Sequence, residues 1–161
     1  MSSKISSYLS FILNQEHFAV NVSKVIEILE VPKLTKVPRA PEYLKGVINL
    51  RGNVLPVIDT RVKFGMPPTE NTIDTCVVVM DIDIEDETLT VGALVDSVKE
   101  VLEIPEDTIK PSPTIGSDYN PEFIEGIVKL GEEFMMILNI GKVFSTHEVA
   151  LLTNNQNQEL K

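Results

Sequence analysis

The sequence is poor in the residues that most often perform chemistry. Its 161 residues include one cysteine, Cys76, two histidines and no tryptophan. A single cysteine cannot form a disulfide within the chain, which favours a reducing compartment, so we expect a cytoplasmic protein. His17 and His147 lie near opposite ends of the chain, and neither has a partner motif for acid–base catalysis. We therefore expect no enzymatic activity.

Motifs for metals and phosphate groups are also missing. There is no CxxC or HExxH spacing, and there is no glycine-rich phosphate loop. The acidic run over residues 81–87 lacks the glycine and the distal glutamate of a calcium loop. We interpret Cys76 as a small buried residue rather than as a reactive thiol. We therefore expect no metal and no cofactor.

Long hydrophobic runs and clusters of positive charge are absent as well. The longest unbroken apolar runs, residues 76–80 and 134–138, are too short to cross a bilayer, and residues 1–7 lack the apolar segment of a signal peptide. Lys and Arg number 14 against 24 Asp and Glu, which gives a net charge of −10. We expect neither nucleic acid binding nor direct membrane insertion, because a polyanion repels phosphate groups. The acidity serves solubility or steers the protein toward a basic partner.

What the sequence does contain is an internal repeat. EYLKGVINL at residues 42–50 aligns with EFIEGIVKL at residues 122–130, an offset of 80. VIEILEVP at residues 25–32 aligns with VKEVLEIP at residues 98–105, an offset of 73. About seven residues inserted near the Pro/Ser/Gly-rich loop at 111–121 explain the difference between the offsets.

Length and repeat together predict one domain made of two related halves. We place the halves at roughly 7–66 and 73–152, so the domain covers 7–152, and we expect a flexible tail at 153–161. With 43% hydrophobic residues, a chain of this length buries a substantial core. Two copies are too few for a solenoid, which favours two small barrels packed together.

Short strands separated by turns account for most of the chain. Alternating or short apolar stretches predict four hairpins, with turns near residues 14–16, 51–53, 85–87 and 131–133. Few helical stripes are long enough to cover a parallel sheet. The fold class is therefore all-β with a few short helices, as two pseudo-repeated, mostly antiparallel β-barrels that share one core.

Three short helices are predicted beside these strands. Ser23 is placed to cap a helix over residues 24–29, and Asp59 is placed to cap the residues that follow it. Asn139 aligns with Asp59 in the repeat, and the same capping role explains both. Residues 145–148 have capping-box spacing before an apolar stretch.

One stretch carries a specific resemblance to a known family. KGVINLRG at residues 45–52, followed by VLPVIDTR at residues 54–61, is similar to the signature of CheW-like domains, which is close to KGVxNLRGxIxPVxDLR. FAVNVSKVIE at residues 18–27, IKPSP at 109–113 and LNIGKVF at 138–144 resemble further motifs of the family, in the same order. The resemblance extends over nearly the whole chain. It implies two five-stranded β-barrel subdomains without catalysis of their own.

The resemblance also implies partners and contact residues. CheW-like adaptors are scaffolds that link the cytoplasmic tip of methyl-accepting chemoreceptors to the regulatory domain of the histidine kinase CheA in chemotaxis signalling arrays. Six residues occupy motif positions that the family uses for partner contact: Val25, Glu27, Gly46, Arg51, Val98 and Val101. The valines then suggest an apolar floor between the barrels, on which a receptor helix docks.

The apolar positions and the glycine have structural alternatives. Val25, Val98 and Val101 suit an ordinary core as well as a groove. Gly46 recurs in the repeat as Gly126, which points to backbone geometry or close packing. Either reading leaves these four positions open as contact residues.

Of the two charged positions, Glu27 is repeated in the second half of the sequence and Arg51 is not. Glu27 recurs as Glu100, which allows a shared structural role, but Arg51 aligns with Gly131. The repeat therefore does not need Arg51 for folding. At a hairpin tip, an arginine is suited to a two-pronged contact with a carboxylate.

Other functions remain open at this level. The chain also fits an adaptor of a related surface-motility pathway, an excised kinase regulatory domain or, from another class, a small ligand-binding β-barrel. The terminated tail, with no receiver domain following, favours a standalone adaptor, and the sequence offers no convergent polar groups for a ligand. We expect the kinase at the barrel ends, through exposed apolar residues near Met66 or Met135–Met136.

Overall fold

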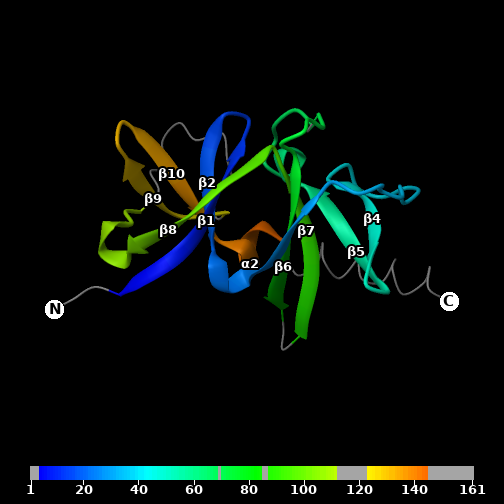
Figure 1. The fold of residues 1–161 in the computed structure, drawn as a ribbon, viewed down its shortest axis with the longest axis horizontal. Helices are drawn as coiled ribbons and strands as arrows, with labels where there is room; N and C mark the ends of the chain where they lie inside the picture. Colours follow the sequence, from blue (N-terminus) through cyan, green and yellow to red (C-terminus); the bar gives the residue numbers. More distant parts are fainter. Residues whose placement is uncertain (1–3, 69, 85–86, 112–122, 145–161) are drawn as a thin grey trace.

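The computed structural model describes residues 4–68, 70–84, 87–111 and 123–144 of the chain. Within them, the strands form two five-stranded sheets with the orders β8-β1-β2-β10-β9 and β3-β6-β7-β5-β4. Figure 1 shows the first sheet on the left and the second on the right. The strands are β1 (Ile5–Leu13), β2 (Glu16–Asn21), β3 (Val25–Glu30), β4 (Leu44–Leu50), β5 (Asn53–Asp59), β6 (Cys76–Ile84), β7 (Glu87–Val95), β8 (Ser97–Pro105), β9 (Ile124–Leu130) and β10 (Glu133–Leu138).

The two sheets have the same topology when β1 to β5 are matched with β6 to β10. In each sheet, an antiparallel hairpin from one half pairs in parallel with the last strand of the other half. The third strands also cross over, since β3 pairs with β6 and β8 pairs with β1. Each sheet thus combines strands from both halves of the sequence. The predicted all-β fold with two five-stranded units is confirmed, and the exchange of third strands is what interlocks them.

One isolated bridge closes each sheet into a barrel. Thr35, after β3, exchanges backbone hydrogen bonds of 2.9 and 2.8 Å with Val47 of β4, and Lys110, after β8, bridges to β9 in the same way. A Cβ atom on Gly46 would lie 2.7 Å from the Thr35 carbonyl oxygen, and one on Gly126 would lie 2.9 Å from the Lys110 carbonyl oxygen. The recurring glycine is therefore required where the closing segment approaches the strand.

The hairpins β1–β2 and β6–β7 are buried on both faces. On β6, Val77 and Val79 pack inside the second barrel, whereas Val78 and Met80 belong to a cluster shared by both barrels. Burial on both faces explains why the apolar run at 76–80 is unbroken rather than alternating. The predicted common core is present, and each barrel has a smaller core of its own.

The hairpins agree with the sequence prediction, and one of the predicted helices does not. Strands flank each of the four predicted turns. The helix expected after Ser23 is wrong, because Val22–Lys24 forms a 3-10 turn capped by Asn21 and β3 follows at once. In β3 it is the burial that alternates with a period of two, whereas the apolar residues themselves, at 25, 26, 28 and 29, have a spacing that also suits a helix.

The two predicted caps at the ends of β5 and β10 have different outcomes. Asp59 caps α1 (Thr60–Lys63), accepting a hydrogen bond of 3.1 Å from the Arg61 backbone N–H. Asn139 makes no side-chain cap bond to α2 (Ile140–Val143), so that prediction is wrong. The predicted capping box at 145–148 and tail at 153–161 lie outside the described residues. No helix in the described ranges is long and apolar enough to cross a membrane.

Gly46→Ala tests whether the closing segment dictates this glycine. We expect a loss of about 1–3 kcal/mol in the free energy of unfolding, because the added methyl group overlaps a backbone oxygen that cannot rotate away. Urea denaturation measures the loss. Gly141→Ala is the matched control, because its added Cβ would lie at an ordinary 3.6 Å from the nearest side-chain atom. Equal stability of the two variants would contradict the packing role.

Candidate functional site

Glu27 and Arg51 are the two predicted site residues that the structure brings into direct contact. Arg51 and Gly52 form the two-residue turn between β4 and β5, with φ angles of 52° and 87°, and the Asn49 side chain accepts a 2.8 Å hydrogen bond from the Gly52 N–H. This turn holds the guanidinium beside the edge strand β3. Arg51 donates to both carboxylate oxygens of Glu27, with Nη1–Oε1 and Nη2–Oε2 distances of 2.5 and 3.0 Å.

The two members of this pair differ in exposure. The Arg51 side chain is 71% exposed and the Glu27 side chain 23% exposed. Hydrogen bonds from Arg51 lower the pKa of Glu27 from its ordinary 4.5, and the same bonds raise the pKa of Arg51. The pair is thus a fully charged, two-pronged contact whose cation faces solvent.

A groove lies next to the pair on the second barrel. Its volume is about 360 Å³, and its lining comes from β3, β5, β6 and β7 together with the β4–β5 turn. Leu50, Val54 and Leu89 contribute apolar surface, and Ile26, which is 49% exposed, lies at the margin beside Glu27. The surface therefore combines apolar contact area with one oriented cation.

The predicted valines do not all line this groove. Val25 and Val98 are half-buried and pack against the core shared by both barrels. Val25 pairs with Met80, whereas the Val98 backbone contacts Cys76, at the other end of the same apolar run of β6. At about 3.3 Å per residue, these contacts are roughly 13 Å apart. The two valines therefore flank the junction between the barrels rather than forming one continuous floor.

Val101 and Gly46 lie apart from the Glu27–Arg51 pair. Val101 is on β8 in the first sheet, where it is 57% exposed. Gly46 is on β4, against the segment that closes the second barrel, as described above. Of the six predicted positions, Glu27 and Arg51 contact each other, whereas the other four are separate from this pair: Val25 and Val98 at the junction, Val101 on β8 and Gly46, which is buried, on β4.

A second groove occupies the corresponding position on the first barrel, and sequence reasoning did not identify it. Its volume is about 380 Å³, and it is lined by residues of the β1–β2 hairpin, β9 and β10. Phe134 is 59% exposed there, and His17 Nε2 lies 2.8 Å from Glu133 Oε2. The alignment of the two glycine motifs, extended along the chain, matches Phe134 with Val54 of the first groove. This match between Phe134 and Val54 could have located the second groove from the sequence.

Of the apolar residues expected to be exposed near Met66 or Met135–Met136, the structure exposes Phe134, whereas the methionines themselves are buried or half-buried. Met135 is fully buried inside the first barrel, and Met66 is half-buried against the shared core. The alternation of β10 instead exposes Phe134 and leaves Met136 half-buried on the same face. The run at 134–138 reads as uniformly apolar, so the sequence does not show which residues face outward.

The chemistry available in the described part of the chain is limited. No group of three or more His, Cys, Asp or Glu side chains in the ranges 4–68, 70–84, 87–111 and 123–144 could hold a metal ion. Burial raises the pKa of the Cys76 thiol, which disfavours the thiolate that nucleophilic reactions need. The arrangement is suited to binding through apolar surface and oriented charge.

Comparison with known proteins assigns the chain to a family. The CheW-like domain family matches residues 7–148. The chain is 33% identical to Chemotaxis protein CheW of Klebsiella aerogenes over 91% of this chain and 86% of that protein, and 34% identical to Probable chemotaxis protein CheW of Rhizobium etli over 87% and 88%. The crystal structure of the scaffolding protein TtCheW from Thermoanaerobacter tengcongensis superposes with a TM-score of 0.79 at 29% identity, over 90% of this chain and 91% of that one. This chain belongs to the CheW-like family of chemotaxis scaffold proteins.

Proposed function

We propose that this protein is a non-enzymatic, cytoplasmic adaptor that links the tip of a methyl-accepting chemoreceptor to the regulatory domain of a CheA-type histidine kinase. Membership of a chemotaxis scaffold family supports this function. The single observation that carries it is the Glu27–Arg51 pair, which presents an exposed guanidinium beside an apolar groove. Interfaces are built from this combination of apolar area and a few oriented polar groups.

Folding alone gives little reason for an arginine at position 51. Water screens its contact with Glu27, and exposed ion pairs contribute little to folding. In the other half of the repeat, Gly131 makes the corresponding turn without a side chain. A partner carboxylate or helix carbonyl that reaches the guanidinium gains a charge-assisted contact. The pair with Glu27 holds the fork in place before binding, which reduces the entropy cost of docking.

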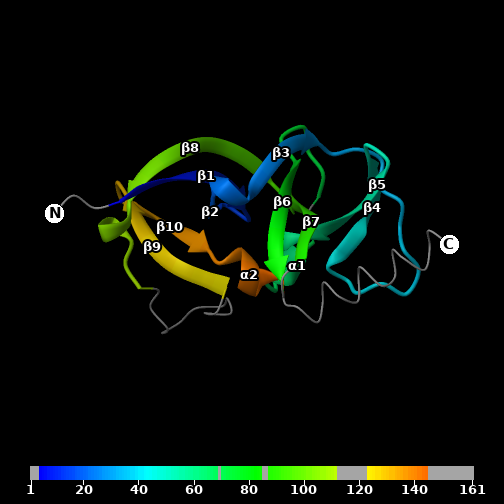
Figure 2. The ribbon, with the colours of Figure 1, turned by 90° about the horizontal axis from the view of Figure 1, so that it is seen from below.

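The junction between the barrels supports a second contact, with the receptor. Val25 and Val98 flank it, and their contacts with β6 are roughly 13 Å apart along that strand, a distance that an α-helix covers in about nine residues. In Figure 2, β3 and β8, which carry these valines, run along the same side of the molecule. A receptor helix with apolar residues two turns apart would contact both valines.

The groove around Phe134 supports a contact with the kinase. An aromatic side chain that is 59% exposed beside a hollow provides a strong apolar anchor. The family resemblance implies that the regulatory domain of the kinase is homologous to this domain, so the proposed contact at the barrel end joins two similar domains. The expected interface is of modest size, on the order of 1,000 Å², and reversible.

Arg51→Ala separates binding from folding. We expect the circular dichroism spectrum and the melting midpoint to stay close to those of the native chain, whereas affinity for a receptor-tip fragment or for the kinase regulatory domain falls roughly tenfold or more. Isothermal titration calorimetry measures both affinities. Lys36→Ala, which removes an exposed cation from the segment between β3 and β4 and outside both grooves, is the control. A melting midpoint many degrees lower, or unchanged affinity for both partners, would count against the proposal.

The carboxyl of Glu27 reports whether the pair forms in solution. Carbon-detected NMR of the native chain should give a midpoint below 4.5, and Arg51→Ala should move it upward, because Arg51 is the main cause of the lowered pKa. The lowered pKa of Glu27 in the folded state also determines how the contribution of the pair to stability depends on pH. Any contribution of the pair is present above pH 4.5 and is lost as the pH falls through the lowered value. Identical midpoints in the two proteins would show that the pair does not form.

Phe134→Ser tests the second groove. We expect kinase affinity to fall roughly tenfold or more while receptor affinity is retained, because Phe134 lies on β10 and not on β3 or β8, which carry the valines proposed for the receptor contact. Ile5→Ser is the matched control, since Ile5 is equally exposed at 59% but lies outside the groove. Equal kinase binding by both variants would remove Phe134 from the interface.

A further inference from the structure

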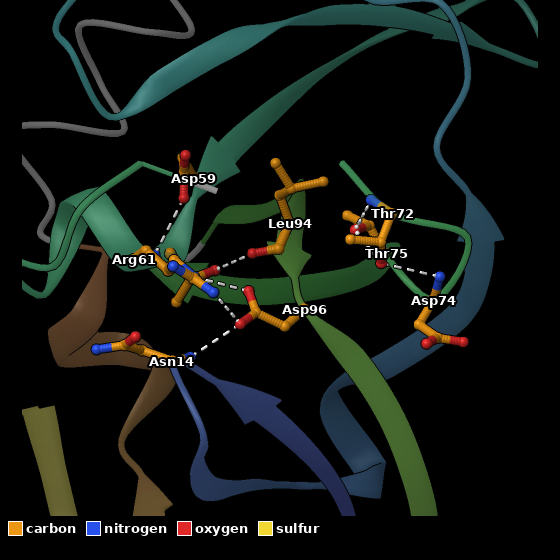
Figure 3. A network of polar contacts seen from close by, with 9 residues as sticks. Asn14, Asp59, Arg61, Thr72, Asp74, Thr75, Leu94 and Asp96 are labelled. Atoms are coloured by element: carbon orange, nitrogen blue, oxygen red, sulfur yellow. Dashed lines mark hydrogen bonds and ion pairs between the residues drawn. The ribbon is translucent and has the colours of Figure 1, made fainter. Parts of the chain in front are cut away.

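A polar network joins the two barrels at one of the points where the chain crosses between them. Asp96 is the single residue between β7 of the second sheet and β8 of the first. Arg61, on α1 beside the second sheet, donates from Nε to Asp96 Oδ1 at 2.8 Å and from Nη2 to Asp96 Oδ2. Figure 3 shows Arg61 and Asn14 both directed at the Asp96 carboxylate.

Asp96 is tied to the first barrel by two further hydrogen bonds. Its backbone N–H donates to the Ile12 carbonyl of β1 at 3.0 Å, and its Oδ2 accepts from the Asn14 N–H at 2.9 Å. Asn14 begins the β1–β2 turn with a φ of 49°. The carboxylate therefore connects α1 of one barrel to the first hairpin of the other.

This connection is well shielded and directional. The Arg61 and Asp96 side chains are 20% and 18% exposed. A two-pronged arginine–carboxylate contact fixes both distance and orientation, whereas the apolar contacts of the shared core are non-directional. The core holds the barrels together, and the ion pair adds a directional side-chain contact between them.

The chain also crosses between the barrels from β2 to β3, and the same contact cannot form there. In the repeat, the alignment of the glycine motifs matches Arg61 with Gly141, and the alignment of the third strands matches Asp96 with Ser23. Gly141 has no side chain, so the counterpart of the Arg61–Asp96 pair cannot form at that crossing. The ion pair found there, Lys24 with Asp83 at 3.6 Å, joins the β2–β3 connection to β6 instead. The duplicated architecture thus does not require Arg61 and Asp96, just as it does not require Arg51.

From these observations we propose that Arg61 is a positioning residue, which with Asp96 fixes the angle between the two barrels. The angle between the barrels is a property of this chain alone, but the effect of that angle on bound partners rests on the proposed function. If the adaptor binds one partner on each barrel, the ion pair sets the relative orientation of the two partners. Loss of the pair then leaves each single contact intact and impairs the complex of all three proteins.

The angle between the two barrels can be tested on this chain alone, from the distance between two spin labels. The labels are placed at Asn53 and Glu132, which are exposed hairpin residues of different barrels, in a Cys76→Ala background. We expect one narrow distance distribution for the native pair and a distribution at least about twice as broad, or displaced, for Arg61→Ala. Arg61→Lys should be intermediate, because it keeps the charge but loses the planar fork.

Two controls separate positioning from stability. Thr60→Val removes the 2.9 Å hydrogen bond from the Thr60 hydroxyl to the Leu94 carbonyl, next to the network, and leaves the ion pair in place. It should lower the melting midpoint without broadening the distribution. The double variant Arg61→Met with Asp96→Asn avoids an unpaired buried charge, so it keeps the test valid where Arg61→Ala fails to fold.

The outcomes distinguish this inference from the proposed function. A narrow, unshifted distribution in the double variant overturns the positioning role, whatever the partners do. If the distribution broadens and each fragment still binds, the three-protein complex should be impaired. Failure of the native chain to bind either fragment would instead remove the proposed function and leave the distance result standing.

Discussion

The exchange of third strands is the constraint on which the rest of the structure depends. Because β3 pairs with β6 and β8 pairs with β1, each hairpin of the repeat has one face inside a barrel and the other against the opposite barrel. Phe11 and Phe18 of the first sheet contact each other, and Phe18 contacts Phe64, which follows α1 of the second barrel. Neither barrel is complete without strands from the other half, so the two barrels are expected to form one cooperative unit.

A duplicated scaffold makes the asymmetric residues informative. Positions that the architecture needs recur in both halves, as Gly46 and Gly126 do where the closing segments approach. Arg51 and Arg61 have glycine as their counterparts, at Gly131 and Gly141, and both form two-pronged contacts with carboxylates. The repeat thus serves as an internal control for folding, and side chains present in one copy alone are the natural candidates for function.

The sequence predicts the features that are local or repeated. Two similar offsets between matching motifs locate the repeat, and the glycine-containing turn at Arg51 and Gly52 locates a hairpin. The sequence does not determine which sheet each third strand joins, because that choice depends on contacts between distant parts of the chain, such as Val25 with Met80. For the same reason, the strand after Ser23 was mistaken for a helix. Its burial alternates only once β6 is beside it.

The candidate site follows the same division between local and long-range information. The family motif singled out Glu27 and Arg51, but their contact is a property of how the β4–β5 turn lies against β3. Phe134 was missed because an unbroken apolar run hides the alternation that points it outward. The two grooves have volumes of about 360 and 380 Å³, and the cation of the Glu27–Arg51 pair faces solvent. Binding through such surfaces is reversible and salt-dependent, so the stable part of an adaptor of this kind is its interlocked core, and its contacts are the part that can change.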